Sequence, residues 1–368
     1  MADINRPPTS ANLVIEETPA AELERAREVH RPVARLPRWE RYLGWLYLVL
    51  LLGAVAWLGW LPRIATAYNV TLALTVLLVI ALATSWNILS GFGGYTSFGH
   101  AGFFGIGSYV GALLIFYERT PWVPAILLAG IATALIALAI GYPTLRLRGP
   151  YFAITMLGLT ELARIVVTAW DGLTLGGNGV YLPILRLEPP VTSGPLLDQA
   201  RNLLGNNQNY YAMLLLAVVA VVVAYAVGTS RFGLELLAIR DDEVAAQAMG
   251  IRTTRVKLAA FALSSFFPGV AGAIYARHIG FIDPPAVFLV IWSIRAIACA
   301  ILGGQGTILG PMLGAVILTL VSEEAWERDP NLYQVILGGL IVLVVLFIPG
   351  GIIALLQNRG WLPRSRRI

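Results

Sequence analysis

Apolar runs recur along this 368-residue chain, separated by short polar segments. A helix of about 20 apolar residues crosses the roughly 30 Å hydrocarbon core of a bilayer and satisfies its own backbone hydrogen bonds there. The pattern therefore predicts an all-α integral membrane protein, a polytopic helical bundle of about ten transmembrane segments within a range of about 8–10. The predicted spans cover residues 42–61, 68–89, 100–117, 122–142, 151–170, 210–227, 258–279, 287–302, 308–321 and 332–356.

The third and ninth predicted spans differ from the others. Residues 100–117 follow a glycine-rich hinge, residues 90–99, and residues 308–321 are short for a crossing. Irregular backbone is tolerated at membrane depth where it is buried in protein. We therefore expect some of the segments to be broken or re-entrant.

One polar island interrupts the apolar pattern, between Arg231 and Lys257. Its charged residues stand at positions 231, 235, 240, 241, 242, 243, 252, 255 and 257. The island is predicted to be helical, with Ser230 as N-cap, Asp241 as a second N-cap if the helix breaks midway, and Gly250 just past the end. Unbroken, this helix would make about five turns. A charged helix between membrane spans must lie in water or against a soluble partner.

The basic residues predict the topology. They cluster in residues 25–41, 146–148, 231–257 and 359–367, and ten crossings put all four clusters on one face. The positive-inside rule makes that face cytoplasmic, together with both termini. The expected organisation is a polar cytoplasmic N-terminal tail (1–41), a transmembrane domain (42–357) with a cytoplasmic segment at 230–257 and an outer loop at 171–209, and a basic cytoplasmic C-terminus (358–368). A second outer polar loop is expected at residues 322–330.

Composition agrees with a membrane protein and narrows its chemistry. Hydrophobic residues make up 57% of the chain and charged residues 13%, and the mean hydropathy is +0.73. The net charge of +5 does not indicate nucleic acid, because the arginines lie just outside the apolar runs. The N-terminal tail lacks an apolar region with a cleavage site, so it is not a signal peptide and is predicted to be disordered.

Catalytic motifs are absent from the sequence. Lys257 is the only lysine and its context is not a Walker A motif, so this chain is not expected to bind or hydrolyse ATP. There is no Gly-x-Ser-x-Gly and no His-Glu-x-x-His. The three histidines, including His100, are far apart in sequence and Cys299 is the only cysteine, so no enzyme activity and no metal site are predicted.

Two polar features inside the predicted spans leave alternatives open. The glycines of the hinge either pack helices closely or expose backbone amides to a polar solute, and His100 is either a solute contact or a satisfied polar group between helices. Glu161 and Arg164, spaced for one helix face, and Arg295 are either solute contacts for a zwitterion or structural ion pairs.

The hinge also carries a family pattern. Asn87, Gly91, Gly94, Ser97, Gly99, His100, Ala101, Phe103, Phe104 and Gly107 match the signature of branched-chain amino acid ABC transporter permeases of the LivM-like kind, and so do blocks at residues 148–155, 157–161, 176–179, 302–311 and 344–349. The chain resembles this family over about residues 70–355. It departs from the pattern at Tyr95, Thr96 and Gly350, which leaves the solute open.

The resemblance implies a permease subunit of a bacterial inner-membrane importer. The implied partners are a second homologous permease, two cytoplasmic ATPases that bind ATP and Mg²⁺ in place of this chain, and a periplasmic binding protein. The implied ATPase-coupling residues are Arg231, Gly233, Arg240, Asp241, Asp242, Ala245, Ala246 and Gly250. The candidates for the translocation pathway or its gate are Asn87, Gly91, Gly94, Ser97, Gly99, His100, Glu161, Arg164, Gly303, Gly304 and Gly306.

Other cargoes and one other class remain open. Importers of urea, short amides and other small carboxylic acids share these motifs. An ion-coupled secondary transporter would place carboxylates in several spans, yet the only acid between Tyr42 and Tyr142 is Glu118, in a predicted loop.

Overall fold

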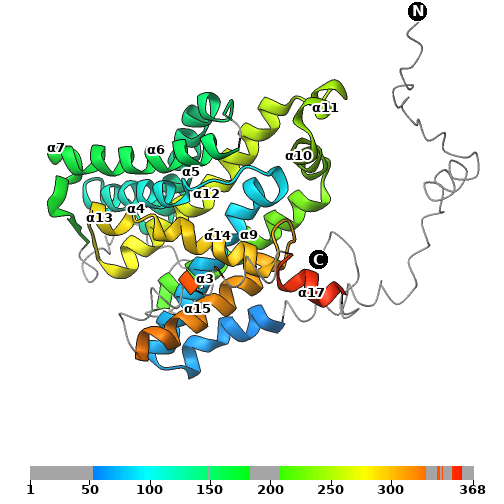
Figure 1. The fold of residues 1–368 in the computed structure, drawn as a ribbon. Coiled ribbons are helices and arrows are strands. Elements are labelled where there is room, and N and C mark those ends of the chain that lie inside the picture. Colours follow the sequence, from blue (N-terminus) through cyan, green and yellow to red (C-terminus); the bar gives the residue numbers. More distant parts are fainter. Residues whose placement is uncertain are drawn as a thin grey trace, which may run out of the picture. The chain divides into compact units, whose positions relative to one another are not determined.

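The structure is a computed structural model that describes residues 53–147, 149–182, 207–328, 338–339, 342 and 350–358. Helices dominate these residues (Figure 1). The longer ones are α3 (Ala67–Trp86), α4 (His100–Phe116), α5 (Trp122–Thr144), α6 (Pro150–Ala169), α9 (Gln208–Thr229), α12 (Thr253–Ile279), α14 (Ile291–Gly303) and α15 (Gly310–Arg328). The predicted all-α membrane fold is confirmed at this level.

The described residues include only part of the ten predicted membrane spans. In the described part of the chain, 6 helices are long and apolar enough to cross a membrane, and residues 100–116 and 310–323 form shorter apolar helices. These two correspond to the third and ninth predicted spans. Most of the first and tenth predicted spans, with the two terminal segments, lies outside the described residues.

Short elements connect the long helices. They are a π-helix η1 (Asn87–Phe92), α7 (Asp171–Thr174), the 3₁₀ turn η2 (Gly176–Asn178), β1 (Val180–Tyr181), α10 (Arg231–Asp241), α11 (Glu243–Ala248), β2 (Phe281–Ile282), α13 (Pro284–Val287) and α17 (Gly351–Asn358). Strands β1 and β2 pair antiparallel, with Val180 opposite Ile282. The described start of the predicted outer loop 171–209 is therefore structured.

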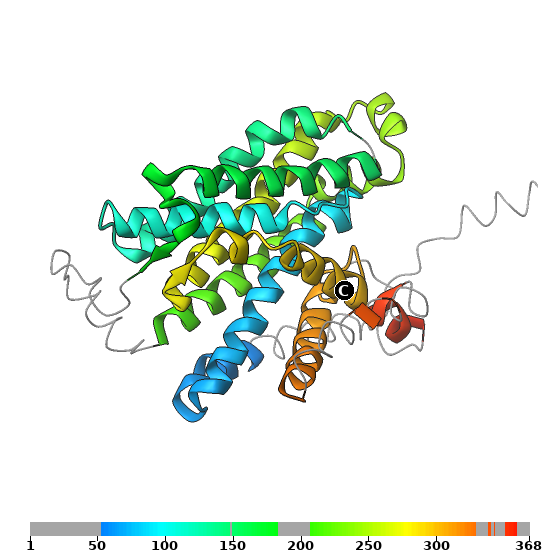
Figure 2. The same cartoon turned by 60° about the vertical axis from the view of Figure 1, so that its left-hand side comes forward.

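Helix α12 lies at the centre of the bundle and packs most extensively against α4 and α5 (Figures 1 and 2). The crossing of α4 and α12 depends on glycine. A Cβ atom at Gly107 would overlap the backbone of Gly269, and one at Gly272 would overlap the carbonyl oxygen of Phe104. Gly107 is thus a close-packing residue, as small-residue faces of membrane helices commonly are.

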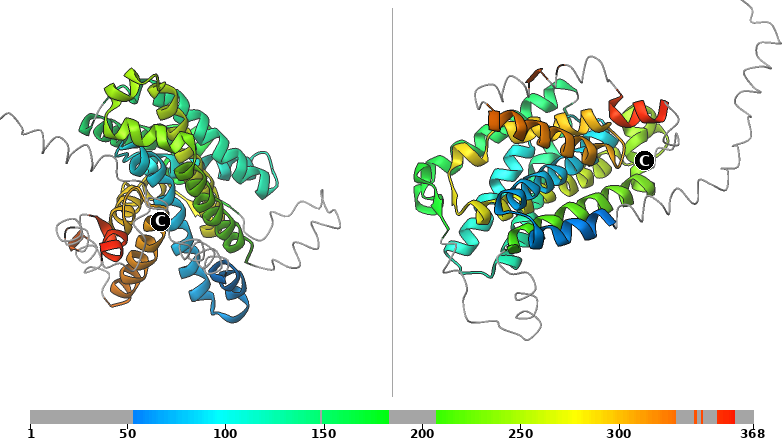
Figure 3. Two further views of the ribbon diagram at one scale, coloured as in Figure 1. Left: turned by 90° about the vertical axis from the view of Figure 1, so that its right-hand side faces the viewer. Right: turned by 90° about the horizontal axis from the view of Figure 1, so that it is seen from below.

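Helices α3, α14 and α15 contact one another and form a second group (Figure 3). Helix α3 also contacts α9 and α12, so it joins the two groups. Helix α15 continues to Arg328, and the predicted loop at residues 322–330 is therefore wrong as far as residue 328. The glutamates and alanine there are good helix formers that extend the apolar helix.

Helices α10 and α11 lie at one end of the bundle, and α7 and α13 lie at the other (Figure 1). The C-terminal end of α3 contacts α10 through η1. The predicted polar island and the predicted hinge therefore meet in space.

Candidate functional site

The polar island consists of two helices rather than one. Ser230 caps α10 as predicted, its hydroxyl accepting a hydrogen bond from the amide of Gly233. The second N-cap is Asp242, whose carboxylate accepts from the amides of Val244 and Ala245 at 2.8 and 3.1 Å. The alternative at Asp241 was wrong by one residue, because the extended backbone of a cap falls on Asp242, with φ −155° and ψ 112°.

Gly250 ends the segment in the left-handed region, with φ +86°, as its predicted place past a helix end requires. The other predicted coupling residues divide by exposure. Gly233 and Ala246 are buried, whereas Arg231, Arg240, Asp241, Asp242 and Ala245 are exposed. Val244 and Met249 are 60% and 84% exposed, so α11 presents apolar side chains outward.

The hinge is held by the loop between α14 and α15. The Asn87 side chain donates to the carbonyl oxygen of Thr307 and accepts from the amide of Gly306, both at 2.8 Å. Gln305 donates to the carbonyl oxygen of Ser90 at 3.1 Å. Two motifs more than 200 residues apart in sequence are therefore joined by side-chain hydrogen bonds.

Arg240 brings α10 to the same place. Its Nη1 donates to the carbonyl oxygen of Gly91 at 2.6 Å. Gly94, with φ +77°, lies against the methylenes of Arg240, and Gly306, with φ +80°, lies beside its guanidinium. We call Asn87, Gly91, Arg240 and Gly306 the hinge junction.

A largely buried charged cluster beside the hinge junction was not predicted. Lys257 on α12 pairs with Glu243 on α11 at 2.6 Å and donates to the Tyr95 hydroxyl at 2.9 Å and to the Leu145 carbonyl oxygen at 3.1 Å. Tyr95 in turn donates to Glu243 at 2.9 Å. The Lys257 and Glu243 side chains are only 6% and 13% exposed. The one signal in the sequence was a lone lysine at the start of an apolar span.

Arg240 of the hinge junction, with Tyr95 and Glu243 of the cluster, borders one cavity of about 500 Å³. The hinge, the start of α6 and helices α10 and α11 line it, with Gly94, Tyr95, Pro150, Arg240 and Glu243 among the lining residues. This end of the bundle therefore combines irregular glycine-rich backbone, paired charges and an open volume.

Other predicted pathway residues lie at the start of α4. Ser97 accepts from the Trp86 indole through its carbonyl oxygen at 2.8 Å and from the Gly99 amide through its hydroxyl at 3.2 Å. His100 is 1% exposed, and neither ring nitrogen has a hydrogen-bond partner among the described residues. Whether His100 contacts a solute or is a polar group between helices stays a prediction.

The remaining predicted residues are not members of the hinge junction. Glu161 and Arg164 pair with each other on the exposed side of α6. Gly303 packs against the backbone of Gly310, and Gly304, with φ +130°, turns the chain out of α14. No group of three or more His, Cys, Asp or Glu residues within the described ranges could hold a metal ion.

Comparison with known proteins decides the family. The profile described as "Branched-chain amino acid transport system / permease component" matches residues 68–345. The chain belongs to this permease family. The matched region includes the hinge, the polar island and the loop after α14, so all parts of the hinge junction lie within it.

Named relatives of the permease agree. It is 33% identical over 324 residues to the high-affinity branched-chain amino acid transport system permease protein LivM of Salmonella typhimurium, covering 83% of this chain and 74% of the relative. LivM of Escherichia coli is 32% identical over 327 residues, with 84% and 74% covered. LivH of Salmonella typhimurium is 28% identical over 306 residues, with 77% and 93% covered. No solved structure gives a significant match.

Proposed function

We propose that this permease forms half of the translocation pathway of an ATP-binding cassette importer for branched-chain amino acids. The observation that carries the proposal is the hydrogen bond from Arg240 to Gly91. It gives a direct contact between an exposed charged helix and the glycine-rich hinge that interrupts the membrane helices. A movement of α10 is thereby transmitted to the hinge.

The partners follow from the same assignment. Two ATPases in the cytoplasm dock against α10 and α11, where Val244 and Met249 supply exposed apolar contacts. They bind the ATP and Mg²⁺, because the only lysine of this chain, Lys257, does not stand in a Walker A motif. A second homologous permease completes the pathway, and a periplasmic binding protein delivers the solute.

The topology belongs to the proposal as well. Ten crossings of a bacterial inner membrane put both termini, α10 and α11 in the cytoplasm, and they put α7 and α13 on the periplasmic side. The hinge junction then lies toward the cytoplasm, where a gate controlled by the ATPases is needed.

Reconstitution tests the function. The permease is produced with the homologous permease, ATPases and binding protein encoded beside it and is placed in liposomes. ATP-dependent uptake of leucine, isoleucine or valine is expected, together with copurification of an ATPase. Uptake of urea or another carboxylic acid in place of these amino acids would correct the cargo. Uptake driven by an ion gradient with this chain alone would show that it is an ion-coupled secondary transporter rather than a subunit of an ATP-driven importer.

A further inference from the structure

A second cavity, of about 260 Å³, lies between α3, α14 and α15. Its lining residue Thr75 precedes Asn87 on the same continuous helix, and 12 residues (87 − 75) correspond to about 18 Å of helix. The cavity is thus toward the end of α3 that is remote from the hinge junction. Under the proposed topology it lies in the outer half of the membrane.

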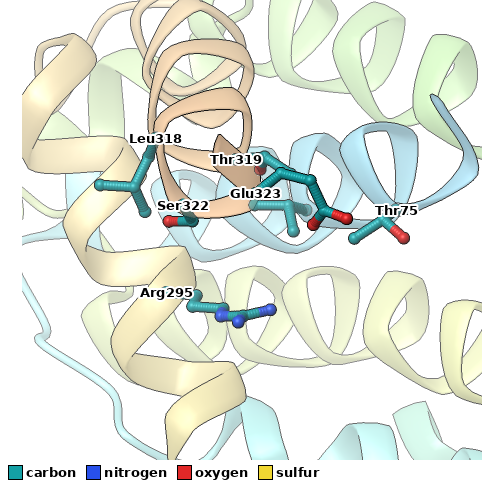
Figure 4. A pocket seen from close by; sticks show the side chains of 7 residues that line it. Thr75, Arg295, Leu318, Thr319, Ser322 and Glu323 are labelled. Atoms are coloured by element: carbon teal, nitrogen blue, oxygen red, sulfur yellow. The ribbon is translucent and has the colours of Figure 1, made fainter. Parts of the chain in front are cut away.

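Two opposite charges line this cavity (Figure 4). Arg295 comes from α14, inside an apolar span, and Glu323 comes from α15. Ionisable residues at membrane depth are costly and face cavities or solute routes. Both side chains are positioned by aromatic neighbours, since Tyr68 donates to Glu323 at 3.2 Å and the Arg295 guanidinium lies 5.7 Å from the Trp292 ring centre.

The rest of the lining divides into hydroxyl and aliphatic groups. Thr75, Thr319 and Ser322 supply hydroxyls, and the buried side chains of Val79 and Leu318 supply aliphatic surface. The volume is close to the lower end, about 300 Å³, of small-molecule sites. A solute of amino-acid size fits this volume and lining, whereas a peptide is too large.

We propose that this cavity, the zwitterion pocket, is a transient binding site for an aliphatic α-amino acid. Arg295 receives the carboxylate, because guanidinium groups bind carboxylates through paired donors. Glu323 accepts from the ammonium, and Val79 and Leu318 contact the aliphatic side chain. The pocket rests on the proposed function, since it takes the same class of cargo.

Thiol labelling tests the zwitterion pocket directly. Ser322→Cys is introduced into the complete importer in lipid nanodiscs, where the native Cys299 is fully buried and stays unlabelled. Leucine is expected to slow labelling of the new thiol. Leucinamide, which lacks the carboxylate, and 4-methylpentanoate, which lacks the ammonium, should each need at least about tenfold higher concentration, the value of one charge-assisted hydrogen bond.

Two further variants test which side chain binds the carboxylate of the amino acid and which binds its ammonium group. Arg295→Gln should make leucine and leucinamide protect equally, and Glu323→Gln should do the same for leucine and 4-methylpentanoate. The matched controls are Arg119→Gln and Glu118→Gln, which remove the same charges from the exposed loop between α4 and α5. Both controls should keep the wild-type ranking.

Several results would overturn the zwitterion pocket. Leucine would give no protection, or all three compounds would protect equally. Alternatively, the ranking of the three compounds would be unchanged in Arg295→Gln and Glu323→Gln, and these residues would then have a structural role only. If Ser322→Cys fails to assemble, Thr75→Cys on α3 reports on the same cavity. Leucine uptake by the wild-type importer is measured in parallel, so failure of the proposed function is seen separately from failure of the pocket.

Discussion

Single side chains connect segments of this permease that are far apart in sequence. Asn87, Arg240 and Lys257 each come from a different helix, and each donates to a backbone carbonyl oxygen of another segment. The bonds from Arg240 and Lys257 are well suited to transmit movement, because hydrogen bonds from charged groups are stronger than neutral ones. Two predictions belong to this scale.

Replacement of Arg240 should uncouple the hinge from α10. Arg240→Ala removes the donor to the Gly91 carbonyl oxygen, so we expect uptake to fall about tenfold, the value of one charge-assisted hydrogen bond. ATP hydrolysis in the same proteoliposomes should continue without proportional uptake. Arg255→Ala, which removes an exposed arginine from the first turn of α12, is the control and should leave uptake near the wild-type rate.

Replacement of Lys257 should destabilise the permease. Lys257→Met leaves the largely buried Glu243 carboxylate without its cation, which costs up to about 3–5 kcal/mol. Thermal unfolding can be followed with a thiol-reactive dye, because Cys299 is buried until the protein unfolds. The double variant Lys257→Met with Glu243→Gln should recover most of the loss.

The controls for this pair match its charges. Arg255→Met and Asp241→Asn remove exposed charges near the cluster, and each should change the free energy of unfolding by less than about 0.5 kcal/mol. A Lys257→Met variant as stable as the wild type would contradict the buried pair.

At the scale of elements, glycine has two distinct uses in this fold. In α4 and α12 it lets two helices touch, as at Gly107 and Gly269. In the turns it permits backbone that other residues avoid, as at Gly250 and Gly306. The same substitution therefore has different consequences at different glycines.

Two alanine substitutions compare these environments. Gly107→Ala should destabilise the permease by about 1–3 kcal/mol, because its Cβ overlaps the backbone of Gly269. Gly158→Ala on α6 has open space around the new methyl group and should stabilise the helix by up to about 1 kcal/mol. The difference is measured as thermal unfolding of the two variants side by side.

Gly250 tests the docking role of α11. No atom lies within 4 Å of a Cβ added there, so a side chain meets nothing within the described part of this chain. Gly250→Val should still assemble but lose transport and ATPase stimulation, since a β-branched residue strains the left-handed turn and fills the docking surface. Gly250→Asn tolerates that backbone and should keep more of the activity. Ala245→Trp, at an exposed position of α11, should behave as Gly250→Val does, and normal coupling in both would remove the docking assignment.

At the scale of the whole molecule, accessibility reports the orientation. Met249→Cys places a thiol at a position 84% exposed, and Glu118→Cys places one at the opposite end of the bundle. An impermeant thiol reagent should label position 118 in spheroplasts and position 249 only in inside-out vesicles. Bound ATPase should protect position 249. The reverse pattern would invert the topology.

Much of this architecture was accessible from the sequence. Six predicted spans from residue 68 onward match helices long enough to cross a membrane, because an apolar run must bury its backbone whatever its neighbours are. The caps at Ser230 and Gly250 were also predictable, since capping is local chemistry. The choice between Asp241 and Asp242 as N-cap could not be predicted, because the carboxylate of either aspartate could accept hydrogen bonds from the first amides of the next helix.

Contacts between distant segments could not be predicted in the same way. Lys257 reaches Tyr95 and Glu243 only after α11 and α12 have packed beside the hinge, and no local pattern encodes that proximity. Arg240 was expected to face a partner protein, whereas its guanidinium bonds to Gly91 within the chain. The hinge junction is visible only in three dimensions.

The π-helix at residues 87–92 holds an extra residue at the end of α3. A π turn bonds i to i+5 and so holds one residue more than an α turn. That surplus residue can pass along the helix as a register slip, advancing the backbone by about 1.5 Å without melting the span. Asn87 and Gly91, the anchors for the loop after α14 and for Arg240, both lie inside it. A force on either anchor can therefore shift the hydrogen-bond register of this segment by one residue, instead of tilting the whole helix as a rigid body.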